Sequence, residues 1–285
     1  MPKISIVTDT DSSMPVSLAE KYGIPQVPIS INFGEGHNET DLTITNKALF
    51  ERIDKEGRLP TTAAPTPGNF ADTFVKAFEK DGSEELVCFC ISSVMSATFE
   101  AAQMAARDIL PDRKITVVDT KTLSVAQAYM TIAAAEAAAR DASVSEIIDI
   151  AESIRDRSFI YGALATLKYL SMSGRVSHIA AGMAGMLNIK PILSVQNGKL
   201  DMLEKVRTRR KAWDRVIQLT KADASRSRIE KMAVLHVAAP DDAREMETLL
   251  RSNMELPDEV LIMELNPGLS VHTGSGLVGV GFVVF

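Results

Sequence analysis

The sequence contains few cysteine, histidine and tryptophan residues, and their scarcity excludes several kinds of site. Its 285 residues include two cysteines, four histidines and one tryptophan. Cys88 and Cys90 lie two positions apart on a predicted strand, so we expect buried, reduced core residues rather than a disulfide or a metal pair. No histidine has metal-ligand spacing to another, and the sequence therefore predicts no metal site. This use of cysteine is typical of a reducing compartment.

Long apolar runs are absent as well. A membrane-spanning helix needs about 18 uninterrupted apolar residues, whereas the longest candidate, segment 126–139, is broken by Gln127 and Glu136. A secretory signal needs a longer apolar stretch than the first residues offer, followed by a small-residue cleavage site. We therefore expect a soluble, cytoplasmic protein.

An excess of positive charge is also missing. The chain has 31 basic and 37 acidic residues, which gives a net charge of -6. Nucleic acids and anionic membranes bind where Lys and Arg predominate, so neither is expected as the main partner. The apolar content of 46% argues against disorder and suffices for two domains with cores of their own.

Strand and helix signals alternate through the first half of the chain. Alternating or β-branched apolar residues predict strands at residues 4–8, 24–33, 86–91 and 115–118. Helical spacing predicts helices at residues 70–78, 97–110 and 124–140. Such alternation requires crossover connections, so the sequence predicts an α/β fold whose N-terminal part has a mainly parallel sheet with flanking helices.

The second half predicts a mixed α/β domain. Strands are expected at residues 159–165, 191–195, 200–206, 232–237, 259–265 and 279–285, and helices at 209–222 and 241–252. Asn197-Gly198 is a strong signal for a two-residue hairpin turn, and the small-residue region around Gly182 and Gly185 favours a helix. We place a domain boundary near residue 160, which gives an N-terminal domain of residues 1–160 and a C-terminal domain of residues 161–285.

A glycine-rich segment lies near the C-terminus. Gly274-Ser275-Gly276-Leu277-Val278-Gly279 has the spacing G-x-G-x-x-G. A dinucleotide site needs a strand before this motif and a helix after it, whereas here a β-branched run follows. The segment therefore predicts a turn, whose N–H groups can still face an anion.

Two acids follow the first predicted strand. Asp9-Thr10-Asp11 resembles the nucleophile and acid pair of haloacid dehalogenase-type phosphatases, which use Mg²⁺ for phosphoryl transfer. The same residues also fit a capped turn between a strand and a helix. A phosphatase needs a later Lys and a further acidic pair, and neither Asp119 with Lys121 nor Asp241-Asp242 has the expected context. A Mg-dependent phosphatase that uses Asp9 and Asp11 is the alternative function.

Hydroxyl side chains gather at two places just before predicted helices. Thr61 and Thr62 lie in a proline-bounded segment, and Ser92, Ser93 and Ser96 follow the third predicted strand. Ligands of open α/β folds bind at the carboxyl ends of parallel strands, although a hydroxyl at a helix start is often only a cap. No G-x-S-x-G elbow occurs, which disfavours a serine hydrolase.

Short pieces of the sequence occur in an order that resembles one known family. They are Val7-Thr-Asp-Thr-Asp-Ser-Ser13, Pro60-Thr-Thr, Ile91-Ser-Ser-Val-Met-Ser-Ala-Thr-Phe99, Val118-Asp-Thr-Lys121, Leu170-Ser-Met-Ser-Gly-Arg-Val176, Leu187-Asn-Ile-Lys-Pro-Ile-Leu193, Lys205-Val-Arg-Thr208 and His272-Thr-Gly-Ser-Gly276. Together they are similar to the DegV family, the fatty-acid-binding proteins that include the lipid-carrying subunit of bacterial fatty acid kinase. The ordered set runs over nearly the whole chain and is far more specific than any single piece.

The resemblance implies a fold, a ligand and a set of binding residues. It implies two α/β domains with a fatty acid, such as palmitate, bound between them and its tail buried. By the matching motifs, Thr62 and Ser96 bind the carboxylate, with Thr61 and Ser93 as the second choice in each cluster and His272 nearby. Hydroxyl donors to a carboxylate are charge-assisted and stronger than neutral pairs.

The pocket that the resemblance implies must be apolar and adaptable. A content of 13 methionines with few aromatic residues suits such a pocket. Met183, Met186 and Leu187 are candidate wall residues, although they fit an ordinary core equally well. The chain has Ala63-Ala64 where the family usually has Ser-Gln, a departure that concerns the preference for chain length more than lipid binding.

The resemblance also implies a partner. Arg207, within Lys205-Val-Arg-Thr208, matches a position where the lipid carrier docks on an ATP-dependent fatty acid kinase. Lys205, Arg207 and Arg209 would share one face if a strand ran through them, although a solvated charged turn also explains this cluster. We expect a carrier without catalytic residues of its own and with no cofactor other than the bound fatty acid.

Overall fold

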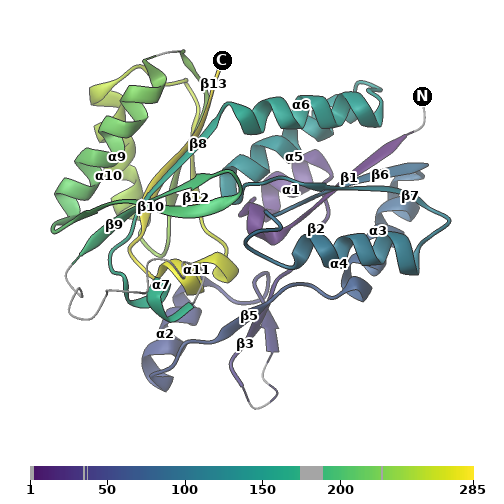
Figure 1. The fold of residues 1–285 in the computed structure, drawn as a ribbon, viewed down its shortest axis with the longest axis horizontal. Coiled ribbons are helices and arrows are strands. Elements are labelled where there is room, and N and C mark those ends of the chain that lie inside the picture. The colour runs from purple at the N-terminus through teal and green to yellow at the C-terminus, as the bar shows by residue number, and fades with distance from the viewer. Residues whose placement is uncertain (1–2, 35, 37, 174–188, 226) are drawn as a thin grey trace.

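The computed structural model describes residues 3–34, 36, 38–173, 189–225 and 227–285. Its strands form three sheets, and the helices lie in layers beside the two larger ones (Figure 1). A parallel sheet from the first half of the chain and a mixed sheet from the second half confirm the predicted fold class. No helix in the described part of the chain is long and apolar enough to cross a membrane.

The parallel sheet comes from the first half of the chain. Its strand order is β2-β1-β6-β7, with β1 at Ile4–Asp9, β2 at Gln26–Val27, β6 at Glu85–Cys90 and β7 at Lys114–Asp119. All its pairings are parallel. Because parallel strands end at one common edge, the loops after β1, β6 and β7 lie together there.

The prediction of one strand at residues 24–33 is wrong. The chain forms β2 and then β3, at Ser30–Asn32, and these belong to different sheets. Pro28 lies between them, and a strand does not readily continue through proline because it has no N–H to donate. β3 pairs with β4 (Asn38–Thr40) and β5 (Thr61–Ala63) in a small antiparallel sheet.

The mixed sheet has the strand order β10-β9-β8-β13-β11-β12. Its strands are β8 at Ser158–Ala163, β9 at Lys190–Gln196, β10 at Lys199–Val206, β11 at Ile229–His236, β12 at Val260–Glu264 and β13 at Val278–Val284. The β11–β12 pair is parallel and the other pairs are antiparallel. Asn197 and Gly198 have φ of 50° and 77°, which confirms the predicted hairpin turn. β13 follows the glycine-rich turn directly, so no helix begins there, as predicted.

The helices connect these strands. They are the 3-10 turn η1 at Thr10–Ser12, α1 at Val16–Tyr22, α2 at Asn46–Glu56, α3 at Pro67–Asp81, α4 at Thr98–Met104, the π-helical turn η2 at Ala105–Ile109, α5 at Ser124–Ala138, α6 at Val144–Asp156, α7 at Lys168–Ser173, α9 at Arg209–Ala224, α10 at Pro240–Asn253 and α11 at Pro267–Thr273.

The core is divided into layers that Figure 1 shows side by side. α3 and α4 cover one face of the parallel sheet, where Phe70 and Phe74 pack with Cys88 and Cys90, both buried and free as predicted. α5 lies against the other face, and its residues share one apolar cluster with both large sheets. α9 and α10 cover the far face of the mixed sheet. α5 is therefore the layer that joins the two halves of the chain.

Part of the sequence analysis concerns residues that the structure does not describe. The small-residue helix predicted around Gly182 and Gly185, and the candidate wall residues Met183, Met186 and Leu187, lie outside the described residues. The domain boundary near residue 160 stays a prediction.

Candidate functional site

A cavity lies between the carboxyl edge of the parallel sheet and the mixed sheet. Its volume is about 1030 Å³, with its opening to solvent included. One wall comes from the segments that follow β1, β6 and β7, and a second comes from strands of the mixed sheet. β5 and α11 supply further parts of the lining. Both halves of the chain therefore contribute to the cavity.

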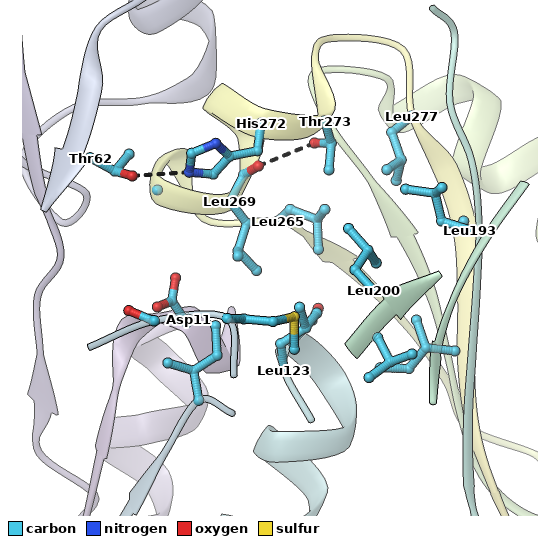
Figure 2. A pocket seen from close by; sticks show the side chains of 18 of the residues that line it. Asp11, Thr62, Leu123, Leu193, Leu200, Leu265, Leu269, His272, Thr273 and Leu277 are labelled. Carbon is cyan, nitrogen blue, oxygen red and sulfur yellow. Dashed lines mark hydrogen bonds between the residues drawn. The ribbon is translucent and has the colours of Figure 1, made fainter. Parts of the chain in front are cut away.

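The side of the cavity formed by the mixed sheet is largely apolar. Figure 2 shows Leu193, Leu200 and Leu277 gathered there. Gly162 of β8 belongs to the same lining, and a Cβ added to it would lie 3.7 Å from Leu277 Cδ1, an ordinary contact distance. Glycine therefore leaves room that a side chain would fill. A surface of this kind favours the burial of a long hydrocarbon chain.

A hydroxyl–imidazole pair lies at another part of the lining. Thr62 Oγ1 is 2.9 Å from His272 Nε2, and both side chains face the cavity (Figure 2). Side chains alternate along a strand, and Thr61, one position earlier on β5, is exposed and outside the lining. β5 and α11 therefore bring together two polar groups that are far apart in the sequence.

A partly buried hydrogen-bond network holds α11 in place. Asn266 is the N-cap of α11; its Oδ1 accepts from Ser13 Oγ at 3.3 Å, and its Nδ2 donates to Asp41. Burial raises the pKa of Asp41 to about 6, although the hydrogen bonds it accepts lower it. Because these contacts tie the start of α11 to the N-terminal half, they fix the position of His272 relative to Thr62.

Ser96 reaches the cavity from the loop after β6. Its Oγ lies 2.8 Å from Thr98 Oγ1 and accepts from Thr98 N at 3.4 Å, at the start of α4. Ser93 lies elsewhere, since its Oγ donates to Asp119 Oδ2 at 2.6 Å and the residue is outside the lining. One member of each hydroxyl cluster therefore reaches the cavity, Ser96 here and Thr62 on β5.

Other polar residues of the lining were not predicted to bind a ligand head group. Ser124 begins α5, and Ser194 lies on β9. The place of Ser124 soon after β7, at the same sheet edge as Ser96, was a signal that could have identified it. Ser194 had no such signal, because its position depends on how the mixed sheet packs against the rest of the chain.

The turn of the β9–β10 hairpin contacts the loop that follows β6 of the parallel sheet. Ser92 Oγ donates to Gly198 O at 2.7 Å, so the hairpin turn lies on the loop after β6. A Cβ at Gly198 would be 2.7 Å from Ser92 Oγ, and the φ of 77° also favours glycine. The Asn197-Gly198 pattern predicts the turn, but this contact with Ser92 could not be predicted from it.

Asp9, the nucleophile of the alternative function, is fully buried. Its carboxyl group accepts from Ile91 N at 2.8 Å, Asp11 N at 2.9 Å and Gln127 Nε2 at 3.0 Å. Burial raises the pKa of Asp9 to about 7. Among the described residues, no three His, Cys, Asp or Glu side chains are placed to hold a metal ion. The geometry gives the phosphatase alternative no support.

The basic cluster lies where β10 leads into α9. Arg207 is exposed and follows the end of β10. Lys205, Arg207 and Arg209 would share a face only if a strand ran through them, and it does not, because the chain turns at Thr208, the N-cap of α9. Arg209 forms an ion pair with Asp242 at 2.8 Å, which reduces the positive charge available to a partner.

Comparison with known sequences identifies relatives over the full length. Residues 3–284 match the model of a family described as "Uncharacterised protein, DegV family". A DegV domain-containing protein of Clostridium perfringens is 32% identical over 283 residues, with 98% of each chain covered. Another, from Streptomyces coelicolor, is 33% identical over 278 residues, with 97% of each chain covered.

Solved structures give the same result. A DegV family protein from Thermus thermophilus, described as fatty acid binding, superposes with a TM-score of 0.87 at 28% identity, covering 100% of both chains. A DegV lipid binding protein from Thermotoga maritima has a TM-score of 0.88 at 26% identity and 99% coverage of each chain. DegV of Bacillus subtilis, a fatty acid binding protein, has a TM-score of 0.87 at 25% identity with 100% of both chains covered. On its sequence and its fold alike, the chain belongs to the DegV family.

Proposed function

We propose that the protein binds a long-chain fatty acid in this cavity, with the tail among the leucines and the carboxylate at Thr62, Ser96 and His272. The observation that carries the proposal is the contrast within one cavity, which has a hydroxyl–imidazole pair in one part and a largely apolar surface in another. The fatty acid and lipid binding described for the similar proteins of known structure supports it.

The tail supplies most of the affinity. A chain of about 15 methylenes, at about 0.8 kcal/mol for each buried group, gives roughly 10 kcal/mol before the costs of ordering. Leucines on the mixed sheet and directly beside it provide the apolar surroundings; Leu193, Leu235 and Leu277 are almost completely buried, and Leu200 is half-buried. A fatty acid such as palmitate suits this surface.

The carboxylate needs hydrogen-bond donors because an unpaired buried charge is strongly unfavourable. The hydroxyls of Thr62 and Ser96 now contact His272 and Thr98. Rotation about the side-chain torsions lets both hydroxyls donate to a carboxylate instead. Hydrogen bonds of this charge-assisted kind are stronger than neutral ones, so the head group gains more than the two hydroxyls give up.

The test is a double variant, Thr62→Ala with Ser96→Ala. We expect it to lose its bound fatty acid while it keeps its fold, since each lost donor to a buried carboxylate costs about 1.5–3 kcal/mol. The matched control is Thr61→Ala, which removes a neighbouring hydroxyl that is exposed and outside the lining. Lipid content is measured by native mass spectrometry and folding by thermal unfolding. Stoichiometric lipid in the double variant would show that the head group lies elsewhere.

We further propose that the protein is a carrier without catalysis of its own, which presents the carboxylate to an ATP-dependent fatty acid kinase. Arg207 is exposed beside the turn into α9, and an exposed guanidinium can pair with two carboxylate or phosphate oxygens of a partner. The use of ATP by the partner agrees with the predicted cytoplasmic location.

The kinase proposal is tested with Arg207→Ala. We expect this variant to keep its fatty acid but to lose acyl-phosphate formation when a cognate kinase and ATP are supplied. Arg210→Ala, which removes a neighbouring exposed charge, is the control. Docking of the unsubstituted protein should also weaken with salt, because charges are screened over about 8 Å at physiological ionic strength. Unchanged phosphorylation would remove Arg207 from the interface, and loss of lipid would assign it to the cavity.

A further inference from the structure

The end of the β9–β10 hairpin extends beyond the strand beside it. β9 pairs with β10 as far as Gln196, but its ladder with β8 ends at Ser194, which lies opposite Tyr161. Residues 195–200, which we call the hairpin tip, therefore pair only with each other. Since β10 is the outer strand of the mixed sheet, no strand of the described chain supports the tip from its other side. The tip can thus move while the rest of the sheet keeps its pairing.

The hairpin tip forms part of the cavity lining. Val195 and Leu200 lie opposite each other on the tip, and both line the cavity. Met95, from the loop after β6, and Leu123, from the loop after β7, belong to the same lining. Figure 2 shows Leu200 and Leu123 among these side chains. The boundary between the hairpin tip and the two loops therefore lies at the cavity.

A single hydrogen bond joins the hairpin tip to these loops among the described residues. Ser92 Oγ donates to Gly198 O at 2.7 Å, and Ser92 is completely buried. A Cβ added to Gly198 would lie 3.6 Å from Lys121 Cβ, so the turn also packs closely on the loop after β7. The loss of one neutral hydrogen bond changes an equilibrium by about fivefold. A contact of this kind keeps the tip closed most of the time and still lets it open.

A bound tail needs a route out of the cavity. Leu193, Leu235 and Leu277, which line it, are almost completely buried. An acyl chain held among such side chains exchanges faster if part of the lining moves aside. The hairpin tip is a part of the lining that moves without breaking the ladder between β8 and β9.

We propose that the hairpin tip is the gate through which the acyl tail enters and leaves the cavity, and that the hydrogen bond between Ser92 and Gly198 holds this gate closed. This inference rests on the proposed function, since it needs a fatty acid in the cavity. It concerns the rate of exchange, whereas the head-group residues determine the affinity.

The first experiment measures exchange in Ser92→Ala. The protein is loaded with deuterated palmitate and mixed with an excess of unlabelled palmitate, and native mass spectrometry follows the exchange with time. We expect exchange about fivefold faster than in the unsubstituted protein, because the open state loses one competing hydrogen bond. The affinity for palmitate should stay within about twofold, since the closed state still predominates.

A covalent bond then tests the gate directly. Ser92 Oγ also accepts from Val94 N at 3.3 Å, so an effect of Ser92→Ala on the loop after β6 has to be separated from its effect on the tip. Lys121→Cys and Gly198→Cys are added to Ser92→Ala, because the Cβ separation of 3.6 Å suits a disulfide and the lost Oγ leaves room for the new Cβ. With the disulfide formed by oxidised glutathione, exchange should be at least about tenfold slower than after reduction with dithiothreitol.

Ser92→Ala without the new cysteines is the matched control for oxidation. It contains only Cys88 and Cys90, which are buried, so its exchange rate should not respond to the oxidant or the reductant. Thermal unfolding checks that each variant folds. The inference is overturned if Ser92→Ala exchanges palmitate at the rate of the unsubstituted protein, or if the oxidised and reduced forms of the cysteine variant exchange equally fast. An unsubstituted protein that binds no palmitate contradicts the proposed function itself.

Discussion

The two parts of the cavity are built in different ways. The apolar part consists of side chains on strands of one sheet or directly beside them, and backbone ladders fix the positions of these strands. The polar part combines β5, the loop after β6 and α11, which belong to different regions of the fold. Side-chain hydrogen bonds, rather than a ladder, tie α11 to β5 and to Asp41. The polar part should therefore be sensitive to single substitutions that the apolar part tolerates.

The largest effect is expected from Asn266→Ala, which breaks the network that holds α11. The variant loses a helix cap, at about 1 kcal/mol, and removes a donor from buried Asp41, at about 1–3 kcal/mol. Its affinity for palmitate should fall at least about tenfold, because His272 is no longer held beside Thr62. Urea unfolding and calorimetric titration with palmitate measure the two effects.

Asn253→Ala is the matched control for this substitution. Asn253 ends α10, and its Nδ2 donates to Leu249 O at 2.8 Å on the exposed surface. The control should change stability by less than about 0.5 kcal/mol. Equal stabilities of the two asparagine variants would contradict the role given to the Asn266 network.

The next effect concerns the pH dependence of stability, which two buried carboxyl groups should produce. Burial raises the pKa of Asp41 to about 6 and that of Asp9 to about 7, above the ordinary value of 3.8. The stability that these two carboxyl groups contribute is fully present below pH 3.8, their ordinary pKa. It is lost as the pH rises through their raised pKa values, because the groups ionise more easily in the unfolded chain. The slope is at most about 1.4 kcal/mol per pH unit for each group.

Asp41→Asn tests this assignment. The variant cannot ionise at position 41, so its stability should depend less on pH between about pH 4 and 6 than that of the unsubstituted protein. Urea unfolding at a series of pH values measures the difference in slope, which is independent of any constant loss from the altered hydrogen bonds. Parallel stability curves would show that Asp41 does not titrate in this range.

The smallest effect on stability is expected in the apolar part, from Gly162→Val. A Cβ at Gly162 meets Leu277 at an ordinary distance, so the new side chain enters the cavity and should cost less than about 1.5 kcal/mol. The co-purified fatty acid should be shorter by about two methylenes, because the added atoms occupy the volume of that part of the tail. Gas chromatography of extracted lipid measures this. Gly68→Ala, in α3, should leave the chain length unchanged, and an unchanged length in Gly162→Val would place the tail elsewhere.

The sequence predicts the regular elements better than the irregular ones. β1, β6, β7 and the β9–β10 hairpin follow from local apolar patterns and from Asn197-Gly198. α6 was missed although its signal is local, since Ser143 and Glu146 form a complete capping box. α11 was missed for a physical reason: it has only seven residues, and it is stabilised by Asn266 contacts with distant residues.

The candidate site likewise contains residues that the sequence predicts and residues that it does not. Thr62, Ser96 and His272 were predicted from motifs, and the structure places all three on one cavity. Their neighbours could not be ranked from the sequence, because the alternation along β5 and the Ser93–Asp119 hydrogen bond appear only in the fold. The Asn266 network also depends on contacts between segments far apart, for which no local pattern exists.

Fatty acid binding is the central claim, and native mass spectrometry of the protein purified without added lipid tests it most directly. The account predicts a mass excess that matches one long-chain fatty acid, such as palmitate, on each chain, and its loss on denaturation. A protein that carries no acyl mass and that cleaves phosphate esters with Mg²⁺, with activity lost in Asp9→Asn, would contradict the account.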